Sequence, residues 1–114
     1  WQVLEPRGMM LIAASMQEDP RESISYADRV GATFPIAVDP NYLTAVADPN
    51  AFPDLFETAQ TWEIRNFPTH VFIDRDGIVV AVVLNQLTTD CAIQYSELAM
   101  GERDDVGRSC KVAD

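Results

Sequence analysis

The sequence predicts an α/β protein in which helices cover a mixed β-sheet, and three stretches of the chain carry that prediction. The apolar run Met9–Ala14 (MMLIAA) has the length and composition of a buried strand. A helix start at Asp19–Glu22 follows it, and a strand–turn–strand pattern spans His70–Leu84. Strands that alternate with helices along a chain are typical of layered α/β folds.

The helix after the first strand has clear signals at both ends. Asp19 can cap it, Pro20 suits the first helical position, and Glu22 can reach back to the free amide at the cap. Gly31 is the natural stop. Between these ends, apolar residues recur at near-helical spacing, and they are Ile24, Ala27 and Val30.

The middle of the chain alternates irregular and regular segments. Thr33–Val38 is predicted to be extended, and residues 40–53, with three prolines, are predicted to form a long loop. Asp54 and Glu57 then repeat the capping-box spacing of a short helix. Its packing face is predicted from apolar positions at i, i+4 and i+7, which are Leu55, Ala59 and Trp62.

The last third begins with the most secure element, a hairpin whose tight turn is Asp76-Gly77 and whose second strand is Ile78–Leu84. Thr88 or Thr89 is expected to cap a final helix that ends at Gly101. We therefore divide the chain into a domain over residues 1–101 and a flexible C-terminal tail over residues 102–114, which has little to bury.

Composition excludes several classes of function. The 114 residues are 47% hydrophobic and 23% charged, as in an ordinary globular domain. The net charge of −10 repels phosphate backbones, so we expect no nucleic-acid partner. The longest apolar run, Ile78–Leu84, is far short of the roughly 20 residues of a membrane span. We also expect no cofactor, because no glycine-rich phosphate loop is present.

The two cysteines and the one histidine do not form a recognisable reactive motif. Cys91 shares a helical face with Tyr95 and Leu98, which favours a buried structural role, whereas Cys110 is expected to be exposed in the tail. A disulfide between them rests on nothing beyond their number. His70 and Asp74 share one face of a strand, but two ligands do not make a metal site, so we predict none.

One block of sequence resembles a known family. Residues Ala59–Ile64 (AQTWEI), followed by Phe67–Gly77 (FPTHVFIDRDG), resemble the block that precedes and forms the hairpin of thioredoxin-like redoxins, in their TlpA-type and peroxiredoxin-type branches. Gly8–Ser15 and Phe34-Pro35 followed by Asp39 match less specific family segments. The resemblance covers about residues 1–100, and it implies a three-layer α/β/α thioredoxin-like fold.

The resemblance also implies a site and a missing part. Phe67, Pro68 and Thr69 would be the substrate-binding residues, with Pro68 in the cis form and its neighbouring backbone free to bond an extended peptide. The family's first core strand and its cysteine motif would lie before Trp1. We therefore expect the chain to lack that strand and the cysteine-bearing start of the first helix, and to hold no catalytic residue of its own.

The function implied by the resemblance is thiol–disulfide exchange, or peroxide reduction, by the complete domain, with a thiol or disulfide as substrate. The chain alone is expected to be inactive, and a strand borrowed from a second copy would give a strand-exchanged dimer. The alternative is a cysteine-less thioredoxin-like module that binds peptides without catalysis. The TlpA-type likeness favours an extracytoplasmic location over a cytoplasmic one, and the sequence does not decide between them.

Overall fold

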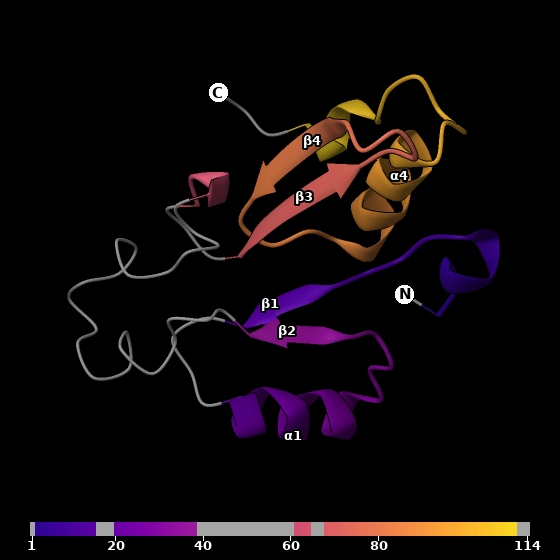
Figure 1. The fold of residues 1–114 in the computed structure, drawn as a ribbon. Coiled ribbons are helices and arrows are strands. Elements are labelled where there is room, and N and C mark those ends of the chain that lie inside the picture. Colours follow the sequence, from indigo (N-terminus) through magenta and orange to yellow (C-terminus); the bar gives the residue numbers. More distant parts are fainter. Residues whose placement is uncertain (1, 16–19, 39–60, 65–67, 112–114) are drawn as a thin grey trace. The chain divides into compact units, whose positions relative to one another are not determined.

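The computed structural model describes residues 2–15, 20–38, 61–64 and 68–111, and these form two compact units. One unit holds strands β1 and β2 with helix α1, and the other holds strands β3 and β4 with helix α4 and the C-terminal segment (Figure 1). The predicted loop over residues 40–53 lies outside the described residues. So does the predicted capping box at Asp54 and Glu57, although residues 61–62 of the helix expected there are helical.

The first unit is a parallel strand pair joined by a helix. β1 (Ala13–Ser15) pairs with β2 (Ile36–Val38), with Ala13 opposite Ile36. A parallel pair needs a crossover connection, because the chain must return to the same end of the sheet. α1 (Pro20–Val30) lies in that connection and packs against β2 (Figure 1).

Helix α1 begins at Pro20 and ends before Gly31, as predicted, whereas the predicted cap Asp19 lies outside the described residues and the predicted packing face agrees only at Ala27. Gly31 follows the helix with φ +71°, a left-handed conformation that glycine adopts without strain. Ser23 and Ala27, one turn apart, are buried. Ile24 and Val30, which the apolar spacing placed on the packing face with Ala27, are instead exposed. Small side chains line the buried face, so the backbone of α1 can lie close to the strands.

The second unit is built on the predicted hairpin. β3 (Thr69–Ile73) and β4 (Val79–Leu84) are antiparallel, with Thr69 opposite Leu84. The pairing shifts by one residue between Phe72 and Ile73, so β4 contains a bulge. The turn is closed by Gly77 N–H donating to the Asp74 carbonyl at 3.1 Å. The prediction of a hairpin here is confirmed.

Helix α4 (Thr89–Ala99) packs against both strands of the hairpin, and the short 3-10 helix η3 (Arg108–Cys110) follows it (Figure 1). The hydrophobic core of this unit lies between them, and it consists of Phe72, Val83, Cys91, Tyr95, Ala99, Val106 and Cys110. The Phe72 and Tyr95 rings stack with their centroids 5.2 Å apart. Because Val106 and Cys110 belong to this core, the expectation that the segment after Gly101 has little to bury is wrong for residues 102–111.

The architecture is mixed α/β, as predicted at the level of class. In the described residues the strands form two separate two-stranded sheets, one parallel and one antiparallel. The strand expected over Met9–Ala14 is shorter in the structure, where β1 begins only at Ala13. It is short because the partner with which it pairs, β2, is itself only three residues long. None of the helices in the described ranges has both the length and the apolar content that a membrane crossing requires.

Candidate functional site

The predicted substrate-binding residues lie where the chain enters β3. Pro68 is an exposed bend immediately before the strand, and Thr69 is the first residue of the strand and is half-buried. Phe67 lies outside the described residues. The Pro68 carbonyl accepts a hydrogen bond from Asn85 N–H at 2.9 Å. This carbonyl is therefore not free to bond a peptide, contrary to what was predicted for the backbone beside Pro68. Asn85 makes the bond from a left-handed conformation, φ +69°, that asparagine tolerates better than most residues.

His70 and Asp74, which share a strand face in the sequence analysis, have separate local roles. His70 Nδ1 lies 3.4 Å from the carbonyl oxygen of Val83, its partner across the hairpin. The Asp74 carboxylate accepts hydrogen bonds from the backbone of Asp76 at 2.9 Å and of Ile78 at 3.0 Å. Asp74 therefore shapes the hairpin turn, in the manner of an Asx turn.

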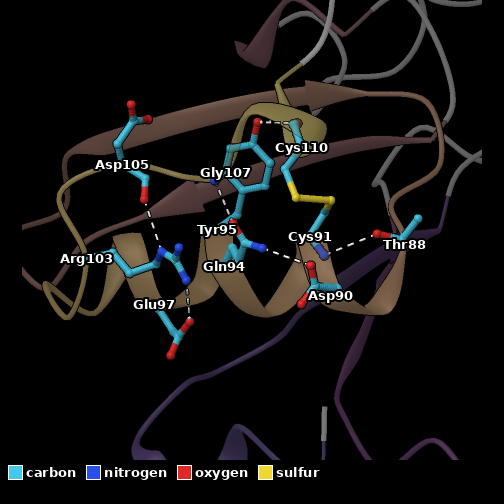
Figure 2. The surroundings of a disulfide bond; sticks show 10 residues. All are labelled: Thr88, Asp90, Cys91, Gln94, Tyr95, Glu97, Arg103, Asp105, Gly107 and Cys110. Carbon is cyan, nitrogen blue, oxygen red and sulfur yellow. Dashed lines mark hydrogen bonds and ion pairs between the residues drawn. A yellow bond between two sulfur atoms is a disulfide. The ribbon is translucent and has the colours of Figure 1, made fainter.

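The strongest chemical feature of the described residues is a disulfide between Cys91 and Cys110, with Cα atoms 5.3 Å apart (Figure 2). The sequence left this pairing open. Both residues are buried, as predicted for Cys91, whereas the expectation that Cys110 is exposed is wrong. The chain contains two cysteines, and neither is free. In this oxidised form the chain therefore offers no thiolate to attack a disulfide or a peroxide.

The helix start positions Cys91. Thr88 is the N-cap of α4, and its hydroxyl oxygen accepts from Cys91 N–H at 3.2 Å, which decides between the two predicted caps. Cys91 is consequently in the first turn of α4, where the helix dipole favours negative charge. Asp90, beside it, accepts from the Gln94 amide at 2.8 Å.

The opposite cysteine is held by polar contacts between α4 and the C-terminal segment. Tyr95 Oη donates to the Cys110 carbonyl at 2.9 Å, and Gly107 N–H donates to Gln94 Oε1 at 2.7 Å (Figure 2). The Tyr95 hydroxyl is thus satisfied inside the core, as a buried phenol requires. Both contacts come from one face of α4, the face that also carries Cys91.

Asp90 and the two cysteines also form the densest group of metal-ligand residue types in the described part of the chain. One carboxylate oxygen and the two sulfurs lie within 4.8 Å of one another. The sulfurs are bonded to each other, however, and a metal binds the thiolate form. In the oxidised chain this group offers a single carboxylate, which does not hold a metal.

Four charged side chains form a network beside the same helix. Arg7 donates to Glu97 at 3.2 Å and also to Glu102, and Arg103 donates to Glu97 at 3.2 Å. The hydrogen bond from Arg7, and then the one from Arg103, lowers the pKa of the Glu97 carboxyl below its ordinary 4.5. Sequence analysis missed this network because Arg7 and Glu97 are far apart in the chain, so no spacing rule connects them.

A second ion pair lies in the C-terminal segment itself. Lys111 Nζ donates to the Asp105 carboxylate at 2.7 Å, and Val106 N–H donates to the other Asp105 oxygen at 2.8 Å. These two bonds, the Lys111 one foremost, lower the pKa of Asp105. Both groups are exposed to solvent, so the pair orients the segment more than it stabilises it.

Comparisons of the chain with protein-family models, with curated proteins and with solved structures found no match. The site therefore stands on its own geometry. It consists of a bend at Pro68, immediately before β3, and of a disulfide that joins α4 to η3 in the same unit.

Proposed function

We propose that the chain is part of a thioredoxin-like redoxin domain whose redox cysteines lie outside these 114 residues. The observation that carries the proposal is the place of Pro68 and Thr69. Pro68 immediately precedes β3, and Thr69 is the first residue of that strand. The hairpin that they begin is followed by a helix, and a β–α–β segment precedes them. This is the order implied by the resemblance of Phe67–Gly77 to the redoxins. The cis form of Pro68 stays a prediction.

Exposed apolar side chains support the view that the sheet is incomplete. Met10 and Ile12, directly before β1, are 71% and 58% exposed, although their run has the composition of a buried strand. On the hairpin, Val82 and Leu84 alternate with the buried Val83 and are also exposed. Strands that are apolar on both faces are typical of the interior of a layered α/β sheet.

In the complete domain, a low-pKa thiolate at a helix N-terminus would attack a disulfide or peroxide, and a second thiol would resolve the product. Pro68 and Thr69 would border the bound substrate. Cys91 and Cys110 would take no part while their sulfurs are buried and joined to each other. A disulfide of this kind is typical of an oxidising compartment, which favours the extracytoplasmic location.

A dithiol-driven assay of protein-disulfide reduction tests this proposal. The 114-residue chain should show no turnover, and the product extended by its upstream coding sequence should show turnover that is lost when an upstream cysteine is replaced by serine. Turnover by the 114-residue chain that Cys91→Ser abolishes would place the chemistry at Cys91 and contradict the proposal.

The alternative is a non-catalytic peptide-binding module, and the engagement of both cysteines in one bond favours it. If the extended product is inactive and carries no upstream cysteine, this alternative replaces the enzyme. An unfolded model peptide should then perturb the amide resonances of Thr69 and His70, which begin β3, and leave those of α1 unchanged.

A further inference from the structure

The segment of residues 102–111, here called the C-terminal strap, is tied to α4 at a few points only. One tie is covalent, between Cys110 and Cys91. Near Cys91, the hydrogen bonds from Gly107 to Gln94 and from Tyr95 to the Cys110 carbonyl join the strap to α4. At its start, Glu102 N–H donates to the Glu97 carbonyl and Arg103 pairs with the Glu97 carboxylate. The disulfide therefore lies near the C-terminal end of the strap, at the same residue, Cys110, whose carbonyl accepts from Tyr95.

The strap has little structure of its own to keep it in place. Its regular part is the three-residue η3, and its buried side chains are Val106 and Cys110. Fixing ten residues costs conformational entropy at each of them, and two buried side chains recover only part of it. The disulfide changes this balance because it removes most of the open conformations from the competing ensemble.

The covered surface is apolar and belongs to the core. Tyr95 stacks on Phe72, and both pack with Val106 and Cys110 in the same cluster. If the strap leaves, the Tyr95 hydroxyl loses its Cys110 acceptor, and the apolar surface that Val106 covers is exposed. The strap therefore covers an apolar surface that, once exposed, would associate with other apolar groups.

The position of Cys91 makes the bond open to exchange once the strap loosens. Cys91 lies in the first turn of α4, and the helix N-terminus stabilises a thiolate that leaves from this position. The neighbouring Asp90 opposes that effect by its charge, and the Lys111 ammonium next to Cys110 is paired with Asp105. Burial of both sulfurs protects the bond while the strap is closed.

We propose that the Cys91–Cys110 bond is a redox latch that holds the strap, and that a dithiol reductant opens it. One thiolate of the reductant attacks a sulfur of the bond and forms a mixed disulfide, and the other cysteine leaves as a thiolate. The second thiol of the reductant then displaces the remaining cysteine. Two electrons and two protons pass to the protein, which gains two thiols, and the reductant becomes a disulfide. This proposal does not depend on the proposed function.

Limited digestion with trypsin tests the latch. Arg108 lies in the strap two residues before Cys110, and Arg75 lies in the exposed turn of the hairpin, where it serves as an internal control in the same unit. After dithiothreitol treatment, cleavage after Arg108 should accelerate at least tenfold relative to the oxidised chain, on the basis of the loop entropy that the bond removes. Cleavage after Arg75 should change less than twofold.

A double variant separates the latch from a direct effect of the reductant. In Cys91→Ser/Cys110→Ser the strap should be cleaved after Arg108 at the fast rate with or without dithiothreitol, and Cys91→Ser alone should behave in the same way. Equal rates after Arg108 in the oxidised and reduced chains would overturn the latch. An equal acceleration after Arg75 would also overturn it, because reduction would then unfold the whole unit. A bond that dithiothreitol leaves intact in the native chain, as counted by thiol alkylation and mass, would do so too.

Discussion

The two units differ in how far their apolar residues are buried. In the unit of β3, β4 and α4, one cluster unites residues from both strands, the helix and the C-terminal strap. In the unit of β1, β2 and α1, by contrast, Ile24, Tyr26 and Val30 of the helix are all exposed. The hairpin unit therefore has a buried core of its own, although Val82 and Leu84 of β4 are exposed, whereas the large apolar side chains of α1 are all exposed. A two-stranded sheet is marginal alone, so the stability of each unit depends on what covers it.

The largest effect should come from the core of the hairpin unit. Phe72→Ala removes the ring that stacks on Tyr95 and leaves a cavity, so we expect a loss of about 3–5 kcal/mol in the free energy of unfolding. Ile24→Ala is the matched control in the other unit, because Ile24 is 53% exposed, and it should change stability by less than about 0.5 kcal/mol. Urea unfolding followed by circular dichroism measures both.

The comparison between the units fails if the two variants lose similar stability. Amide hydrogen exchange then shows which of the two units is the more stable. Protection should be highest in β3, β4 and α4 and lower in α1, because exchange of buried, well-packed elements requires larger opening. Protection that is greatest in α1 would show that the first unit is the more stable one and that its exposed apolar residues do not weaken it.

Sequence predicted the elements whose signals are local. The hairpin follows from Asp76-Gly77, and the ends of α1 follow from Pro20 and Gly31, because caps and turns are decided by a few neighbouring residues. Apolar spacing was less reliable. It placed Ile24 on the buried face of α1, where Ser23 lies instead, because which face is buried depends on the partner strands and not on the helix.

Contacts between distant segments could not be predicted in the same way. Two cysteines permit one disulfide but do not require it, and whether Cys91 and Cys110 meet depends on how η3 packs against α4. The bond from Asn85 to Pro68 likewise depends on the register of the hairpin, so no local signal indicates that this carbonyl is occupied. Of the predicted site residues, the structure shows only that Pro68 immediately precedes β3 and that Thr69 is its first residue. Their role in binding stays a prediction.

A smaller effect should come from the cap that positions Cys91. Thr88→Ala removes the oxygen that accepts from Cys91 N–H and should cost about 1 kcal/mol of stability. Thr88→Ser keeps a hydroxyl and should recover most of the loss. Thr89→Ala, at the first residue of α4, is the matched control and should be near neutral. The same urea titration measures all three, and a Thr89→Ala loss equal to that of Thr88→Ala would contradict the assignment of the cap.

The smallest effect should come from the charge network of Arg7, Glu97, Glu102 and Arg103, and the sign of that effect follows from the pKa of Glu97. The folded-state pKa of this carboxyl lies below its ordinary 4.5, so its contribution to stability is complete above that pH. The contribution is lost as the pH falls through the folded-state value, because the protonated carboxyl no longer pairs with Arg7. Glu97→Gln should therefore lower the urea midpoint slightly at pH 7, and the difference from wild type should vanish in acid and shrink in high salt. A difference that persists undiminished at low pH would show that Glu97 supports the hairpin unit through packing and not through its charge.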